Sequence, residues 1–497
     1  MRVLLVNPPN HRPKADGFPN LVFQPLGLAY LAAILKKKGF KVGILDCLGE
    51  GWNQERVEGD WRITGLTFGE IEKRLREFNP EVVGVGIPFT SQGELAHKTL
   101  AIIKKVKSNI FTLVGGADPS VRYKDQLEDK NLDAVVIGEG EETLIELLKI
   151  RATRGNWKKV PGIAYRGNGK IIKTKTRKPI LSLDRLPFPA RKLLPMDAYF
   201  EAAKKARAER VGSTLGKRWA SLITSRGCPY HCLFCTVHGI MGKVWRPRSP
   251  ENVLEEIKLL RRNFGIEHLL IEDDNLTLDL SRAEKLFDLM IAENLGITWS
   301  TPNGVRADKL TERLIIKMKK SGCTLLCVAP ESGDQAVVNK IIKKNLDLQM
   351  VEKVVDWCQK HKLAVEAFFI IGFPGETIAQ MRKTLDFAKK LLKLGLQEFS
   401  LFIATPFYGT ELYEIAQKKG YLREIFDESR LRVDFQDVEI EPLIETPDFT
   451  AQDLINFRLE AVKISPKFSW PKIKFGLKLA VADPSLALKV SLGRLIK

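Results

Sequence analysis

Short apolar runs alternate with longer stretches of helical periodicity in the first part of the chain. The runs are rich in Val, Ile and Leu and lie at residues 3–6, 42–45, 82–87, 112–114 and 134–137. Amphipathic stretches of helical length lie between or after them, at residues 26–38, 69–78, 93–106 and 141–150. Because alternating strands and helices are typical of a parallel sheet covered on both faces, we predict a doubly wound α/β domain over residues 1–155.

A second alternation of the same kind predicts a partial barrel over residues 215–410. Its apolar runs lie at residues 220–224, 268–271, 297–300, 324–328, 364–371 and 398–403. The helical stretches between them lie at residues 250–263, 281–294, 309–320, 347–361 and 377–394. A complete barrel of this kind has eight strand–helix units, with its functional face at the carboxyl ends of the strands. The pattern therefore predicts a (β/α)6 barrel with its site at that end.

The remaining segments connect or follow these two domains. Residues 156–214 contain two short strand patterns, at 163–166 and 170–173, on either side of Gly167-Asn168-Gly169, which is typical of a hairpin. Residues 178–195 are rich in proline and arginine and are expected to form an extended linker. We expect residues 411–497 to be helical and basic.

Composition narrows the possible locations and partners. The 497 residues include seven cysteines, an odd number with three close together, which favours a reducing, cytoplasmic compartment over a disulfide framework. No apolar run is long enough to predict a membrane span. The formal net charge of +19 suits an anionic partner such as nucleic acid or a membrane surface, but also a lysine-rich solvated surface. We favour the solvated surface and do not expect nucleic acid.

The strongest chemical signal is a loop of three cysteines directly after the first barrel strand. Cys228, Cys232 and Cys235 lie in the sequence SRGCPYHCLFC. Cysteine thiolates are the usual ligands of iron–sulfur clusters, so we predict a metal site in which three thiolates hold a [4Fe–4S] cluster. One iron then lacks a protein ligand and can be chelated by a bound molecule.

A zinc site is the alternative for this loop, with His231 or His238 as the fourth ligand. We disfavour it because zinc sites usually pair two short cysteine elements and the chain offers no second one. Cys323, Cys327 and Cys358 lie in apolar patterns and are expected to be buried packing residues.

The C-x3-C-x2-C loop after the first strand of a partial barrel resembles that of the radical S-adenosylmethionine (SAM) superfamily. The resemblance implies that SAM binds the open iron and is cleaved there to a 5′-deoxyadenosyl radical. It also implies SAM contacts at Phe234 near the adenine, at acids after the second strand, at a Glu-Ser-Gly turn after the fourth and at a glycine-rich turn after the fifth. These residues are Glu272, Asp273, Asp274, Glu331, Ser332, Gly372, Pro374 and Gly375. Helix caps and ordinary turns are the alternative explanations.

The front domain resembles the cobalamin-binding domain of one class of these enzymes. In open α/β sheets the ligand lies outside the carboxyl ends of the strands, and special residues collect at these ends and at the start of the first helix. They are Pro8, Pro9, Gly27, Gly115, Gly116, Gly138, Glu139 and Gly140. Two departures are visible: the D-x-H-x-x-G motif that supplies a cobalt-binding histidine is absent, and Ala117-Asp118 follow Gly116 where the family often has a histidine.

The combined resemblance implies a cobalamin-dependent radical SAM methyltransferase that acts on an unactivated carbon of an unknown organic substrate. A flavodoxin or ferredoxin is implied as the electron donor. Ring formation, oxidation or carbon–carbon coupling without methyl transfer is the first alternative. A tRNA-modifying methylthiotransferase is the second, which we disfavour because its front domain carries three cysteines and this one has only Cys47. A non-catalytic cobalamin or cluster sensor is the third.

The segment from Lys463 onward combines apolar and basic residues. Its members include Trp470, Ile473, Phe475, Leu477, Lys467, Lys472, Lys474 and Lys478. We favour a terminal helix that caps the barrel. The alternative is peripheral contact with an acidic membrane surface, or a cover over a lipid substrate.

Overall fold

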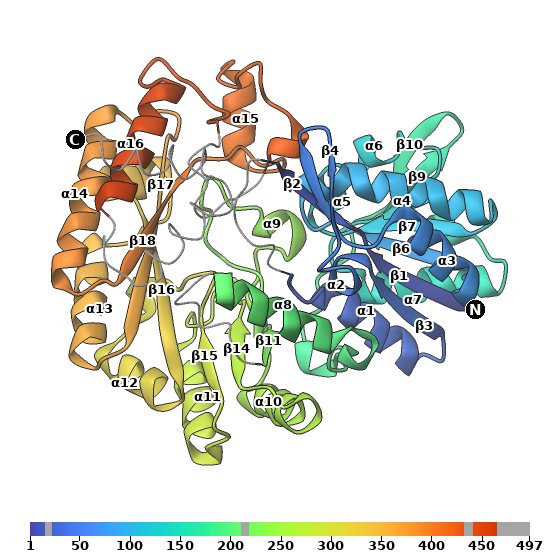
Figure 1. The fold of residues 1–497 in the computed structure, drawn as a ribbon, viewed down its shortest axis with the longest axis horizontal. Coiled ribbons are helices and arrows are strands. Elements are labelled where there is room, and N and C mark those ends of the chain that lie inside the picture. The colour runs from blue at the N-terminus through green and yellow to red at the C-terminus, as the bar shows by residue number, and fades with distance from the viewer. Residues whose placement is uncertain (15–21, 210–217, 432–440, 465–497) are drawn as a thin grey trace.

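The computed structural model describes residues 1–14, 22–209, 218–431 and 441–464. Two α/β bodies lie side by side, the front domain on the right of Figure 1 and the barrel on the left. The mixed order of strands and helices agrees with the predicted fold class, an α/β front domain followed by a partial barrel.

The front domain is built on a seven-stranded sheet in the order β10-β9-β8-β7-β6-β1-β3. Its parallel part comprises β1 (Arg2–Asn7), β3 (Lys41–Asp46), β6 (Val82–Gly86), β7 (Phe111–Gly115) and β8 (Ala134–Val136). These strands are apolar on both faces because helices cover both faces. Helices α1 (Leu26–Lys37) and α7 (Gly140–Ala152) share one core with the sheet, and α3 (Phe68–Phe78) and α4 (Gly93–Val106) share the other.

The predicted hairpin extends this sheet instead of belonging to a linker. Strand β9 (Ile163–Gly167) pairs antiparallel with β8, and β10 (Lys170–Lys173) pairs with β9 at the edge. The predicted parallel sheet therefore gains two antiparallel strands at this edge. The backbone groups of β8 would otherwise be unpaired there, and the hairpin satisfies them.

A second small sheet in the front domain was not predicted. Strands β2 (Asn10–Pro13), β5 (Trp61–Thr64) and β4 (Glu55–Glu58) pair antiparallel. They are short, and β4 is mostly exposed, so they lack the apolar run that marks a buried strand. Helix α2 (Cys47–Glu50) connects β3 to this sheet.

The barrel has six parallel strands in chain order, as predicted. They are β11 (Trp219–Leu222), β14 (His268–Ile271), β15 (Thr298–Ser300), β16 (Cys323–Glu331), β17 (Ala364–Ile371) and β18 (Glu398–Ile403). The outer helices are α10 (Pro250–Phe264), α11 (Leu280–Glu293), α12 (Glu312–Lys320), α13 (Leu348–Lys360) and α14 (Ile378–Leu394). Outward strand residues pack on these helices, as Trp299 stacks on Phe287 of α11 at 5.1 Å between ring centres.

The segment between the two bodies is more ordered than the predicted extended linker. It contains two 3₁₀ turns, η3 (Leu183–Arg185) and η4 (Arg191–Leu193), and then helix α8 (Met196–Glu209), which was not predicted. Tyr199 of α8 is fully buried, and its hydroxyl donates a hydrogen bond to Asp46 at the end of β3. This contact ties α8 to the front domain.

After the barrel the chain forms α15 (Glu411–Lys418), the 3₁₀ turn η7 (Glu428–Arg430) and α16 (Ala451–Ile464). Helix α16 lies against β18 and α14. The predicted tail surface around Trp470 and Lys474 lies outside the described residues. Within the described ranges, no helix combines the length and apolar character needed to cross a membrane.

Candidate active site

The cysteine loop begins where the first barrel strand ends and is anchored on two sides. Gly227, directly before Cys228, has φ +81°, and a Cβ there would lie 2.4 Å from the carbonyl oxygen of Val244. Further along the loop, the Leu233 amide donates to the Ile342 carbonyl oxygen at 2.9 Å, and the Leu412 amide donates to the Leu233 carbonyl oxygen at 3.1 Å. The backbone conformation of the loop is therefore fixed by Gly227 and by hydrogen bonds to two segments that are distant in the sequence, at Ile342 and Leu412.

The three cysteines of this loop are unpaired and partly buried. Burial raises the pKa of each thiol, for Cys235 to about 12, and the charges of Cys228 and Cys232 add to the rise at Cys235. The thiols thus lie close enough to affect one another and need a positive partner to be held as thiolates. A donor set of three clustered sulfur atoms fits an iron–sulfur cluster.

The two histidines of the zinc alternative contact each other and the backbone. The rings of His231 and His238 lie 4.6 Å apart, and the carbonyl oxygen of Cys228 accepts a hydrogen bond from Nε2 of His238 at 2.9 Å. In the described part of the chain, no three His, Cys, Asp or Glu side chains gather around a single ion position.

The glycine-rich turn after β17 comes close to the cysteine loop. The rings of Phe234 and Phe373 lie 5.9 Å apart, and both Gly372 (φ +90°) and Gly375 (φ +88°) have left-handed backbone. The Glu376 carboxylate is buried and accepts from the amides of Gly372 at 2.8 Å and Phe373 at 3.1 Å. Pro374 lies within this turn, so the structure brings the predicted adenine-side residues together.

The acids after β14 contact the start of the cysteine loop. Asp273 is buried and accepts from the amide and hydroxyl of Thr224, each at 2.5 Å, and from the hydroxyl of Ser225 at 2.6 Å. Asp274 accepts from the Gly227 amide at 2.9 Å. Glu272 accepts from Ser221 at 2.5 Å, and burial raises the pKa of its carboxyl. These contacts give Asp273 and Asp274 a structural task in holding the loop.

Asn275 follows these acids and is the more informative neighbour of the first cysteine. Its side chain is 2% exposed, and neither polar atom has a hydrogen-bond partner of accepted geometry among the described residues. Yet it lies close enough to Cys228 to favour the thiolate and lower the pKa of that thiol. A buried amide left without a partner beside a predicted ligand fits a site completed by a bound molecule.

The Glu-Ser-Gly turn after β16 divides into two environments. Glu331 has φ +67° and its carboxylate accepts from Nζ of Lys344 at 2.6 Å, with both side chains buried. Ser332 faces the other way, with its hydroxyl 3.0 Å from that of Thr384 on α14. Glu331 therefore lies on the cysteine side of the turn and Ser332 on the packing side.

Two cations near the cysteine loop were missed from the sequence. The charges of Lys344 and Arg306 lower the pKa of Cys232, against the larger effect of burial. The Arg306 guanidinium lies 3.6 Å from the ring centre of Tyr230 and donates to the Lys344 carbonyl oxygen at 2.9 Å. Neither residue belongs to a motif. In the structure, a π-helical turn (Val337–Ile341) lies just before Lys344. Such turns often occur at functional sites, but no sequence pattern marks this one.

The predicted cobalamin edge lies at the carboxyl ends of β7 and β8. Gly116 has φ +130°, and a Cβ there would lie 2.5 Å from the carbonyl oxygen of Ile87. Ser120 links the two strand ends, because its hydroxyl donates to the Gly116 carbonyl oxygen at 2.7 Å and accepts from the Gly138 amide at 2.9 Å. Gly115 ends β7, and Gly140 begins α7.

Other predicted cobalamin residues differ in accessibility. Gly27 is exposed at the start of α1, and a Cβ there would meet no atom within 4 Å, so backbone is open to a large ligand. Pro8 and Pro9 are buried. Phe89, which the sequence did not single out, is 63% exposed just after β6. The exposed backbone at Gly27 and the exposed ring of Phe89 fit a broad, flat ring system.

This edge faces the segment that follows the cysteines. Helix α5 (Ala117–Val121) packs on α9 (Val237–Ile240), which lies between the two bodies in Figure 1. A Cβ at Gly239 would lie 2.9 Å from the side chain of Val121, and a Cβ at Gly138 would lie 3.9 Å from the Ile240 carbonyl oxygen. The two predicted cofactor regions are therefore neighbours.

Family profiles and relatives agree with this arrangement. The profile of the Radical SAM superfamily matches residues 222–388, and that of the B12 binding domain matches residues 19–148. The cytidylyl-2-hydroxyethylphosphonate methyltransferase of Streptomyces wedmorensis is 35% identical over 453 residues, which cover 85% of this chain and 82% of the relative. An uncharacterized methyltransferase of Pyrococcus horikoshii is 33% identical over 419 residues, which cover 84% and 83%.

A solved structure shares the fold of nearly the whole chain. The cobalamin-dependent S-adenosylmethionine radical enzyme OxsB, with aqua-cobalamin and S-adenosylmethionine bound, aligns with a TM-score of 0.71 at 17% identity. The alignment covers 98% of this chain and 72% of that chain. The two bodies thus occur together, in the same order, in a known structure.

Proposed function

The chain belongs to the cobalamin-dependent radical SAM enzymes, and on this premise we propose that it is a methyltransferase acting on an unactivated carbon of an organic substrate. Its cofactors are a [4Fe–4S] cluster, SAM and cobalamin. When bound, they supply reductive cleavage of SAM, removal of a substrate hydrogen atom and donation of a methyl group to the carbon left behind.

The observation that carries the proposal is the contact between the cysteine loop and the glycine edge of the front sheet. Helix α9 begins two residues after Cys235 and packs on α5, which begins directly after Gly116. Radical formation and methyl donation must act on one substrate, so the two regions need to lie close together. Two relatives that are 35% and 33% identical are named methyltransferases, which favours methyl transfer over other cobalamin-dependent radical reactions.

Each group of residues has a proposed task. Cys228, Cys232 and Cys235 hold the cluster, and Asn275 lies where SAM would meet it. Phe234 and the turn at Gly372, Pro374 and Gly375 form the adenine side. Gly27, Gly115, Gly116, Gly138 and Gly140 would line the corrin site, and the exposed ring of Phe89 after β6 would add a further contact. The buried Glu331–Lys344 pair adds charge next to Cys232.

The test is anaerobic turnover with methyl-labelled SAM and a low-potential reductant. Cytidylyl-2-hydroxyethylphosphonate is the first probe, because a 35% identical relative is named for it. Label in a carbon-bound methyl group of the probe, together with 5′-deoxyadenosine, supports the proposal. Production of 5′-deoxyadenosine with a modified but unlabelled product would instead support ring formation, oxidation or carbon–carbon coupling.

The two predicted partners outside the active site need separate tests. We propose a flavodoxin or ferredoxin as reductant, to be checked by replacing the chemical reductant with either protein.

Contact of the basic C-terminal segment with an acidic membrane is checked by flotation of the full chain with phosphatidylserine vesicles, and absence of co-flotation would contradict it. A methylthiotransferase would need three cysteines in the front domain, whereas residues 1–155 contain only Cys47, which is fully buried.

A further inference from the structure

Four buried charged side chains connect the front domain to the cysteine loop. Glu139 accepts from Arg226 at 2.8 Å with one carboxylate oxygen and from Arg246 at 2.6 Å with the other. Glu141 accepts from the second terminal nitrogen of Arg226 at 2.7 Å. All four side chains are at most 7% exposed. We call Glu139, Glu141, Arg226 and Arg246 the interdomain clamp.

The clamp lies between the two predicted cofactor regions. Arg226 precedes Cys228 by two residues, and β12 (Ser225–Arg226) pairs with β13 (Arg246–Pro247), so both arginines belong to the base of the cysteine loop. Glu139 directly follows Gly138 at the glycine edge, and Glu139 and Glu141 flank Gly140. A shift of either carboxylate would thus move the loop relative to that edge.

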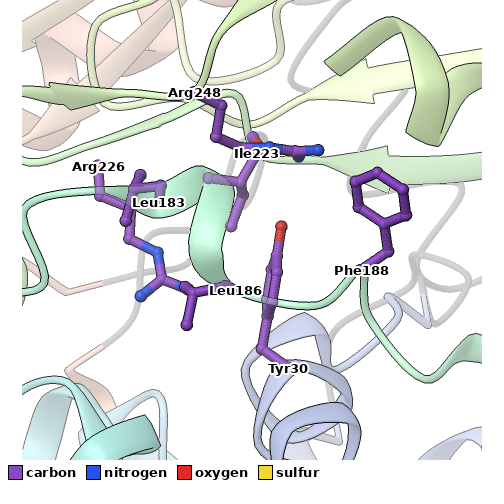
Figure 2. Close-up of a pocket in the computed structure, with 7 residues that line it drawn as sticks. All are labelled: Tyr30, Leu183, Leu186, Phe188, Ile223, Arg226 and Arg248. Carbon is purple, nitrogen blue, oxygen red and sulfur yellow. The ribbon is translucent and has the colours of Figure 1, made fainter. Parts of the chain in front are cut away.

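Further contacts hold the side chains of the clamp in their orientations. Arg246 also donates to the carbonyl oxygens of Met241 at 2.6 Å and Ile180 at 2.7 Å, and the Ile180 amide donates to Glu139 at 2.9 Å. The Arg226 guanidinium lies 5.1 Å from the ring centre of Tyr30 on α1. Figure 2 shows Arg226 and Tyr30 around a small cavity, which is also lined by Leu183, Leu186, Phe188, Ile223 and Arg248.

The formal charges in the clamp are balanced, and the arginines favour the ionised form of Glu139. Burial raises the pKa of Glu139, but Arg226 and Arg246 outweigh it and hold that pKa below its usual value. Two guanidinium groups face two carboxylates, so no net charge is buried. An arginine fork that meets two carboxylates has few alternative geometries. Buried apolar residues could join the two domains equally well, but they would not fix an angle as closely.

We propose that the interdomain clamp is a positioning device, which sets the distance and orientation between the cluster and the cobalamin. This rests on the proposed function and adds the residues that keep its two cofactors in register. Glu139 and Glu141 are positioning residues that act through Arg226, and the expected corrin contact of Glu139 is replaced by this role.

The test measures the magnetic interaction between the reduced cluster and cob(II)alamin by electron paramagnetic resonance. The full chain is reconstituted anaerobically with iron, sulfide and hydroxocobalamin, in the wild-type form and as Glu139→Gln, Glu141→Gln and Glu428→Gln. Glu428 is the matched control, since it also joins the front domain to the second half of the chain through Arg122 but does not touch the cysteine loop.

We expect Glu139→Gln and Glu141→Gln to bind both cofactors in wild-type amounts, with a changed or broadened spin–spin interaction. Formation of 5′-deoxyadenosine from SAM and dithionite alone should change about tenfold, because small displacements of reacting groups have effects of this size or larger. Glu428→Gln should match the wild type in both measurements. If Glu139→Gln does not fold, Glu139→Asp, which keeps the charge but shortens the reach, provides the same comparison.

An unchanged spin–spin interaction in folded Glu139 and Glu141 variants that carry both cofactors would overturn the clamp. An equal change in Glu428→Gln would also overturn it, because any interdomain ion pair would then have the same effect. Wild-type protein that binds iron and sulfide but no corrinoid would instead refute the proposed function, and the clamp with it.

Discussion

At the residue scale, the loop from Gly227 to Cys235 combines a left-handed turn that requires glycine with three thiols whose pKa values are raised. Left-handed backbone at Gly227, the bond from the Gly227 amide to Asp274 and two further amide anchors hold the loop in one form. Such a loop presents its sulfur atoms before any metal arrives. The cysteines should therefore bind a cluster as a set, and no single one should be dispensable.

Cys232→Ala should abolish cluster binding and reduce 5′-deoxyadenosine formation from SAM to background, because two thiolates leave a second iron without a protein ligand. Cys358→Ala is the control: Cys358 is fully buried in α13, away from the loop, and its loss should cost about 1 kcal/mol of stability without loss of iron. Iron content and product formation are measured together. Full iron occupancy and activity in Cys232→Ala would contradict the assignment.

Gly227→Ala should destabilise the loop by about 1–3 kcal/mol and lower the yield of reconstituted cluster, since its Cβ would meet both a left-handed φ and the Val244 carbonyl. Gly59→Ala separates these two effects. Gly59 has φ +60° and open space around it, so its replacement should cost only about 1 kcal/mol. Urea unfolding and iron content measure both variants. Equal effects on cluster yield would argue against a steric role of Gly227.

Site residues that lie close together in the sequence could be predicted from it. Residues whose role depends on a partner far away in the sequence could not. Cys228, Cys232, Cys235 and Phe234 follow from one short loop. The Arg226–Glu139 contact joins residues 87 positions apart. Lys344 and Arg306 also lie far from the loop they influence. Pairing across such separations depends on the folded arrangement, which no local pattern contains.

At the element scale, the turn between β17 and α14 depends on a single buried carboxylate. Glu376 accepts two backbone amides within the turn, and Thr377 and Gln380 cap α14 directly after it. Burial raises the pKa of Glu376 to about 7 although both amides lower it. The turn is thus linked to pH near neutrality.

The raised pKa predicts a loss of stability with rising pH. The carboxyl binds a proton more tightly in the folded state than in the unfolded chain, where its pKa is 4.5. Its stabilising contribution is therefore complete below about pH 4.5 and is lost as the pH rises through about 7. The total is at most about 3.5 kcal/mol, since each pKa unit corresponds to about 1.4 kcal/mol.

Glu376→Gln should remove this component, so the difference in unfolding free energy between the wild type and the variant should change between pH 4.5 and 8. This difference is measured by urea unfolding of the iron-free proteins at several pH values. The contributions of the other carboxyl groups cancel in the difference, because both proteins contain them. A difference that stays constant over this range would show that Glu376 does not titrate with a raised pKa.

Helices and strands were predicted correctly where their own apolar residues mark them as buried. All six barrel strands and their five helices carry apolar runs long enough to be read directly. The β9–β10 hairpin was predicted as an element, but its place in the sheet depends on the open edge of β8. Helix α8 was missed although Met196, Tyr199, Phe200 and Ala203 form one buried face, because the proline-rich segment directly before it suggested an extended linker.

At the scale of the whole molecule, the two bodies could be predicted separately but their mutual placement could not. The alternation of strands and helices indicates both bodies, and their carboxyl ends indicate both sites. The carboxyl ends of the two sheets are joined by the contact between α5 and α9 and by the buried ion pairs of the interdomain clamp. Placement of one domain on another depends on surface complementarity that sequence periodicity does not record.

Because the loop is anchored to Ile342 and Leu412, cluster binding should stabilise the barrel as a whole. We expect the anaerobically reconstituted protein to melt a few degrees above the iron-free protein, about 2–4 °C for each kcal/mol gained. The Cys232→Ala protein treated with iron and sulfide should show no such rise, as measured by calorimetry under nitrogen. A rise of the same size in Cys232→Ala would mean that iron binds elsewhere.

The central claim is that three thiolates hold a cluster with one iron open to SAM, next to bound cobalamin. Anaerobic reconstitution, followed by iron, sulfide and corrinoid analysis and by Mössbauer spectroscopy with and without SAM, tests it most directly. We predict about four irons and four sulfides for each chain, one corrinoid, and one iron site whose spectrum changes when SAM is added. Zinc in the cysteine loop, or a cluster whose four irons do not respond to SAM, would contradict the account.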